Sequence, residues 1–256
     1  MNPRSLLCAP LLALVASFTG PTAHAAAFPG PESYEITLHQ NGQAAEIFRA
    51  PGFYQQGSVV SASAFASPFP LATASATSVR DMSSPAHRTD AGARLAYELV
   101  VNGPQDGVAI PLFVQGRLHA EAQTELPLVT FAGASLSVVN SSGGAGHLLN
   151  TGSVDYTGPD LTVTLPFTQL SGEIGFVLLQ AVATAVDGGS ASAWVDPYFF
   201  IDPDFLAANP GYSVTLSPGV VNAVPLPGAL ALLGSGLALL AAHYPSRRRA
   251  ERRGMQ

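Results

Sequence analysis

Residues 94–101 read RLAYELVV, and their apolar side chains alternate with polar or small ones: Leu95, Tyr97, Leu99 and Val101 share one parity. Successive side chains of a strand point to opposite faces of its sheet, so this pattern predicts a strand with one face on a core and the other in water. The same period of two recurs in residues 34–38, 108–114 (VAIPLFV), 161–167 (LTVTLPF) and 212–216 (YSVTL). The body of the chain is therefore predicted to be mainly β.

Turn-forming residues separate these runs: Asn41-Gly42, Asn102-Gly103, Asp106-Gly107, Gly158-Pro159 and Asp187-Gly188-Gly189. Many short strands divided by such turns predict an antiparallel β-sandwich or a jelly-roll-like fold. We expect this domain to occupy residues 26–223, which is long enough for a two-sheet core. Residues 61–85, rich in Ala, Ser, Thr and Pro, are typical of a long surface loop or of an edge region with weak register.

Residues 1–25 have the pattern of an export signal. Arg4 precedes an apolar stretch at residues 6–18, and Ala23 and Ala25 stand at the −3 and −1 positions of a small-residue cleavage site. We predict cleavage after Ala25, so that the mature chain begins at Ala26 and reaches its destination through the secretion machinery.

Composition excludes several kinds of site. Cys8 is the only cysteine and lies in the predicted signal, so the mature chain has no disulfide, no cysteine nucleophile and no thiolate metal ligand. Residues 26–223 carry 16 acidic residues and 5 arginines, a formal net charge of −11. Such a surface repels phosphate backbones, so nucleic acid is not an expected partner.

A search for catalytic patterns gives little. The sequence contains no H-E-x-x-H, no G-x-x-x-x-G-K-[ST] and no G-x-S-x-G motif. His119 and Glu121 share a strand face and could begin a metal site, although a solvated pair is the favoured interpretation. Paired carboxylates for glycoside cleavage depend on a separation in space. We therefore expect no enzyme, no cofactor and no metal, with a secreted glycan-active hydrolase as the alternative.

One constellation stands out in residues 192–205, SAWVDPYFFIDPDF, where one parity holds both aromatic and acidic residues: Trp194, Asp196, Tyr198, Phe200 and Asp202. Aromatic plates beside carboxylates could stack on sugar rings and bind their hydroxyls, and the acids could also ligate Ca²⁺. Val195, Phe199 and Ile201 occupy the other parity, so a third interpretation, which we favour at this stage, buries both faces. Pro197 and Pro203 point to an edge strand or a bend.

The C-terminus, residues 224–256, has three parts. A proline-containing motif comes first, then 19 residues, 226–244, without a charged side chain, then a basic tail over 245–256. As a helix the apolar run would measure about 28 Å, close to the ~30 Å hydrocarbon core of a bilayer. Five arginines cluster beyond it: Arg247, Arg248, Arg249, Arg252 and Arg253. The positive-inside rule then predicts one transmembrane helix with the body outside the cytoplasm.

This order of parts resembles the PEP-CTERM sorting signal, in its variant written V-P-L-P-A. The motif residues are Val224, Pro225, Leu226, Pro227 and Gly228, with Gly228 in place of the final alanine. The body segment SASAWVDPYFFIDPDF, with YSVTLSPGV after it, also resembles a segment common in such proteins, to which no function is attached.

The resemblance implies a polysaccharide-producing Gram-negative bacterium. It also implies transient anchoring in the inner membrane, processing near residues 224–228 by an exosortase, and delivery to the cell surface or extracellular matrix. We therefore expect an exported, non-enzymatic surface or matrix protein that associates with exopolysaccharide.

Overall fold

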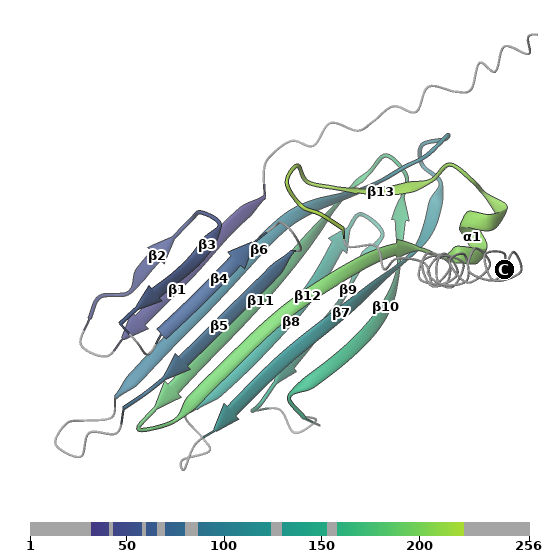
Figure 1. The fold of residues 1–256 in the computed structure, drawn as a ribbon. Coiled ribbons are helices and arrows are strands. Elements are labelled where there is room, and N and C mark those ends of the chain that lie inside the picture. The colour runs from purple at the N-terminus through teal and green to yellow at the C-terminus, as the bar shows by residue number, and fades with distance from the viewer. Residues whose placement is uncertain are drawn as a thin grey trace, which may run out of the picture.

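The computed structural model describes residues 32–40, 43–57, 60–65, 70–79, 87–123, 130–152 and 158–222. They form two antiparallel sheets that pack against each other (Figure 1). Sheet A has the strand order β2-β1-β6-β11-β8-β9, and β13 also pairs with β6. Its strands are β1 (Ser33–Gln40), β2 (Glu46–Phe48), β6 (Arg88–Asn102), β8 (Phe131–Asn140), β9 (Gly143–Asn150), β11 (Ile174–Val186) and β13 (Ser213–Leu216).

Sheet B has the order β10-β7-β12-β5-β4-β3. Its strands are β3 (Gly52–Gln56), β4 (Val60–Phe65), β5 (Leu71–Thr77), β7 (Ala109–Gln123), β10 (Asp160–Leu170) and β12 (Ser190–Ile201). One short helix, α1 (Pro203–Ala208), follows β12.

The core lies between the two sheets. In β12 every second residue is buried and those between are partly exposed, as the period of two requires. Large side chains from both sheets fill the space, among them Leu95, Leu99 and Leu179 from sheet A and Leu112, Leu118 and Phe199 from sheet B. Full burial of a side chain of this size contributes about 1.5–3 kcal/mol. The predicted antiparallel β-sandwich is confirmed, and its jelly-roll form stays a prediction.

The described parts of the small-residue stretch 61–85, residues 61–65 and 70–79, differ from the expectation of a loop or sheet edge. β4 and β5 lie inside sheet B, between β3 and β12. Their alanines face the core: Ala62, Ala64, Ala72, Ala74 and Ala76. These residues keep the strand period of two, but a methyl group is so weakly apolar that the alternation of Ala with Ser and Thr is easily mistaken for loop composition.

β12 is a central strand for only half its length. It pairs with β7 from Ser190 to Ile201, but its pairing with β5 ends at Val195. Beyond that point the side chain of Asn222 takes the place of a neighbouring strand. Its Oδ1 accepts from the Phe199 N–H at 3.1 Å, and its Nδ2 donates to the Phe199 carbonyl at 2.8 Å. Pro197 has the same parity as Phe199, so its missing N–H faces this free edge, where proline is tolerated.

Several predicted features lie outside the described residues. They are the signal cleavage site at Ala23, Ala25 and Ala26, the motif Val224–Gly228, the apolar run 226–244 and the basic tail. Among the residues that the structure does describe, no helix has the length and apolar character needed to cross a membrane.

Candidate functional site

The outward side chains of β10, β7 and β12 form one continuous surface, which we call the outer B face. On β12 it carries Trp194, Asp196, Tyr198 and Phe200, while the residues between them are buried in the core. β7 lies alongside and places one outward residue opposite each of these four: His119, Arg117, Gln115 and Phe113, in that order. Aromatic and charged groups therefore share a surface that faces solvent.

Three aromatic rings stack at one end of this face. The centroids of Phe113 and Phe200 are 5.3 Å apart with an interplanar angle of 23°, and those of Tyr198 and Phe200 are 5.4 Å apart at 22°. Phe113 stacks across from β7 and Tyr198 along β12, and aromatic stacking of this kind is favourable. The result is an apolar plate.

A second plate lies further along the strand. The rings of Trp194 and His119 are cross-strand partners, 5.7 Å apart and nearly parallel at 3°. The His119 Nδ1 atom lies 2.9 Å from an Asp160 carboxylate oxygen, and its Nε2 lies 3.4 Å from the Ser192 hydroxyl. These contacts on both ring nitrogens fix the imidazole plane against the indole. On the other side of Trp194, its cross-strand partner in β5 is the small Thr73.

An ion pair separates the two plates. Arg117 and Asp196 are direct cross-strand partners, and an Arg117 Nη atom bonds the Asp196 carboxylate. The outer side of Arg117 is solvent-accessible, with 64% of its side chain exposed. Surface ion pairs of this kind contribute little to stability, typically about 0–1 kcal/mol. The pair nevertheless holds a five-donor guanidinium and a carboxylate acceptor between two apolar plates.

Two tyrosines near this strand have shifted ionisation. Partial burial raises the pKa of Tyr198 above its usual value, so this phenol keeps its proton at neutral pH and remains a hydrogen-bond donor on the face. Burial also raises the pKa of Tyr97 in the core beneath, and the negative charge of Asp196 raises it further.

The structure brings together most of the residues singled out in the sequence. Trp194, Asp196, Tyr198 and Phe200 lie on the outer B face with His119, whose Nε2 atom is 3.9 Å from a Glu121 oxygen. Asp202 does not join them: it caps α1, where its Oδ1 accepts from the backbone N–H groups of Asp204 and Phe205. Pro203 at the first helical position turns the chain away from the strand direction.

Asp196 and Asp202, the acids considered for calcium, therefore have separate partners. In the part of the chain that the structure describes, no three or more His, Cys, Asp or Glu side chains are grouped to hold a metal ion.

Four members of the face were missed in the sequence: Phe113, Gln115, Arg117 and Asp160. The first three do alternate in residues 113–119, FVQGRLH, so their shared parity was readable. Their position opposite the Trp194 row depends on the register of β7 with β12, which no local pattern specifies.

Comparison with known proteins adds little. No family model matches the chain, and no curated protein matches it. A solved structure of TmCBM61 in complex with beta-1,4-galactotriose matches with 15% sequence identity and a TM-score of 0.26, over 54% of this chain and 91% of that one. A TM-score this low supports no inference about what this chain binds.

Proposed function

We propose that this chain is an exported, non-enzymatic surface or matrix protein whose sandwich body binds glycan through the outer B face. The observation that carries the proposal is the row on β12 and β7, in which two aromatic plates flank an ion pair on a solvent-facing sheet surface. The row makes no contribution to the core, because the opposite parity of β12 already fills it.

The chemistry of the row suits a sugar. The apolar face of a sugar ring can stack on an aromatic plate, while the hydroxyls around its rim need donors and acceptors. Arg117 supplies donors, Asp196 supplies an acceptor, and the neutral Tyr198 phenol does both. Alternate residues of a strand are about 6.8 Å apart, so the plates at Trp194 and Tyr198 are separated by about 13 Å and can contact different units of one chain.

Export and sorting complete the proposal. Their support is in the sequence: the signal-like residues 1–25, the motif Val224–Gly228, the apolar run and the arginine cluster. Asn222, the last described residue, is bonded to β12, and the motif begins two residues after it in the chain. We propose that an exosortase processes the chain there after transient anchoring in the inner membrane, and that exopolysaccharide is the partner of the body.

The test uses affinity gel electrophoresis to measure how strongly the purified protein binds exopolysaccharide of the producing strain. Trp194→Ala removes one plate and should weaken binding about tenfold, which corresponds to ~1.4 kcal/mol. Leu148→Ala removes an exposed apolar side chain from β9 in sheet A, away from the outer B face, and should leave binding unchanged. Equal retardation of the Trp194→Ala variant and the unaltered protein would show that the outer B face is not the glycan site.

The hydrolase alternative is tested in the same samples. Three carboxylates lie on this face: Glu121, Asp160 and Asp196. Each lies close to a cationic or titratable side chain of β7. A hydrolase would release reducing ends from the glycan and would lose that activity in Asp160→Asn or Asp196→Asn. We expect no release from the unaltered protein.

A further inference from the structure

The outer surface of sheet A, on the opposite side of the sandwich, contains a hollow of about 470 Å³. Four strands, β1, β6, β11 and β8, contribute to it, and Gly92 of β6 forms part of its lining at the centre of the sheet. A smaller hollow of about 380 Å³ adjoins it and shares Arg94. Volumes of this size are typical of small-ligand sites.

Gly92 is what opens the hollow. It stands between Thr37 of β1 and Val182 of β11 in the sheet register. A Cβ atom built on it would have only the Thr37 Cβ within 4 Å, at 4.0 Å, and its φ angle is in the ordinary range for any residue. Neither backbone conformation nor crowding therefore requires glycine here. Glycine weakens a strand interior, so its use at this position leaves an open space at a cost to stability.

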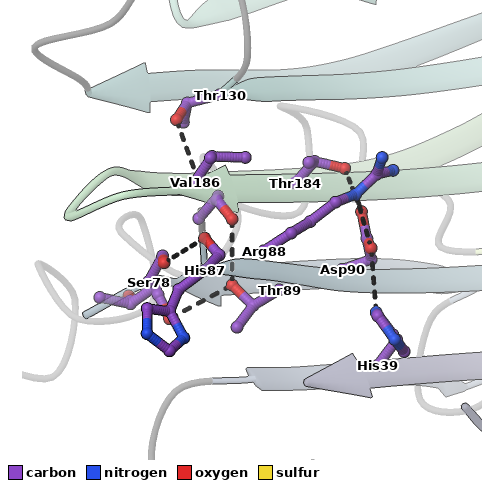
Figure 2. A network of polar contacts seen from close by, with 11 residues as sticks. His39, Ser78, His87, Arg88, Thr89, Asp90, Thr130, Thr184 and Val186 are labelled. Carbon is purple, nitrogen blue, oxygen red and sulfur yellow. Dashed lines mark hydrogen bonds and ion pairs between the residues drawn. The ribbon is translucent and has the colours of Figure 1, made fainter. Parts of the chain in front are cut away.

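The walls of the hollow are polar and held in place. Asp90 is bonded from three sides: His39 Nδ1 at 3.2 Å, Arg88 Nε at 2.9 Å and the Thr184 hydroxyl at 2.7 Å (Figure 2). At the other end, Arg94 makes no hydrogen bond or ion pair with any residue of the described ranges. The Phe131 ring lines the hollow beside Thr184, its cross-strand partner.

The charges of the hollow point to the class of ligand. Its lining holds two acidic residues, Glu35 and Asp90, and two arginines, Arg88 and Arg94, so the formal charges of these four side chains sum to zero. The carboxylates would repel an anion, and the guanidinium groups would repel a cation. An uncharged ligand that carries many hydroxyls can use both, since each hydroxyl donates and accepts.

We propose that this hollow is a second saccharide site, specific for an uncharged sugar unit, with Phe131 as its stacking surface. The outer B face and this hollow lie on opposite sheets with the core between them (Figure 1). One protein molecule therefore cannot bind the same stretch of glycan with both sites. The body then has two glycan sites and cross-links separate glycan chains. The cross-linking, though not the second site itself, rests on the function proposed for the outer B face.

The experiment titrates the whole chain, purified in detergent, with neutral cellotetraose, galactotetraose and xylotetraose, and with oligogalacturonate as the charged probe. Gly92→Leu fills the hollow without backbone strain, and Gly92→Ala, which adds a single methyl group, is the matched control. We expect two molecules of a neutral probe per chain for the unaltered protein and for Gly92→Ala. Gly92→Leu should bind only one molecule. Trp194→Ala should still bind two, one of them about tenfold more weakly, and the double variant should keep only the weakened site.

Other outcomes separate the two proposals. If Gly92→Leu binds as many neutral molecules as Gly92→Ala, or if the hollow takes only the charged probe or none, the second site is overturned. If Trp194→Ala binds both molecules with unchanged affinity while Gly92→Leu binds only one, the outer B face is not a glycan site and the proposal for the hollow stands. Turbidity of a neutral glycan polymer mixed with the protein reports cross-linking, which Gly92→Leu should abolish and Trp194→Ala should reduce.

Discussion

At the scale of single residues, Tyr97 is a buried polar group whose hydroxyl has no hydrogen-bond partner within the described ranges. Its ring lies edge-on to Phe199, with centroids 6.5 Å apart at 87°, so the ring packs well while the hydroxyl is desolvated. An unsatisfied buried polar group costs about 1–3 kcal/mol. Tyr97→Phe should therefore raise the free energy of unfolding by up to this amount at neutral pH, as measured in urea with an unchanged m-value.

The same variant should change the pH dependence of stability. Burial, with the Asp196 charge as a second cause, raises the pKa of Tyr97 in the folded state, whereas in the unfolded chain it ionises near its usual value of about 10. Above about pH 10 the unfolded state therefore loses this proton first, and stability falls as pH rises further toward the folded-state pKa. Tyr97→Phe removes that loss, so its advantage should be larger at pH 10.5 than at pH 8, by about 0.5 kcal/mol or more. An equal advantage at both values would argue against the burial of this hydroxyl.

The same scale shows why the site was only half predictable. Trp194, Asp196 and Tyr198 were grouped correctly on one face because side-chain parity along a strand is a local property. Whether that face lies in the core or on the surface is not a local property of the strand. The sequence favours burial of both parities, whereas the structure leaves the Trp194 parity partly exposed. Asp202 has the right parity too, but Pro203 starts a helix directly after it, and one helical residue is enough to break the alternation.

At the scale of elements, β12 shows how side chains complete a strand that lacks a neighbour. Asn222 bonds both the N–H and the carbonyl of Phe199, as a paired strand would. Asn222→Ala should leave both groups without this partner, so the Phe199 amide should exchange with solvent much faster. Asn222→Asp is the matched comparison, because its carboxylate still accepts from the N–H but no longer donates to the carbonyl.

Hydrogen exchange followed by NMR at Phe199 separates these cases. We expect protection to fall in Asn222→Ala and to persist in large part in Asn222→Asp, since the acceptor of the amide hydrogen is retained. The amide of Val195, which pairs within the sheet, should be unaffected in both. Identical exchange at Phe199 in all three proteins would show that Asn222 does not protect this edge.

The strands themselves were the most predictable elements. Runs such as 94–101 and 161–167 lie within β6 and β10, because their large apolar residues alternate over enough positions to identify a face. β4 and β5 were misread because alanine gives a weak signal. Strand order was beyond prediction: β6 lies between β1 and β11, which are far apart in the chain, and such pairing depends on the packing of the whole core.

At the scale of the whole molecule, the last described residue of the body, Asn222, is close in the chain to the point where the proposed sorting signal begins. Asn222 is fixed on β12 and the motif starts at Val224, so a span of four residues, 223–226, covers the stretch up to the first residue of the apolar run. An extended chain of this length reaches at most about 14 Å. If the run spans the inner membrane, the folded body lies directly on the outer surface of the bilayer before it is processed.

The sorting proposal predicts where a body-tagged chain is found. In a strain with the exosortase, the tagged body should be released from the inner membrane with a mass lower by its C-terminal helix; without the enzyme, it should remain in the membrane fraction at the larger mass. Replacing Pro225 and Pro227 by alanine should reproduce the enzyme-deficient result, while Pro218→Ala, at an exposed proline of the body, should be processed normally. A chain that keeps the same mass and stays in the membrane in both strains would make residues 226–244 a permanent anchor, because a removable label and an anchor differ only in whether the peptide bond near the motif is cut.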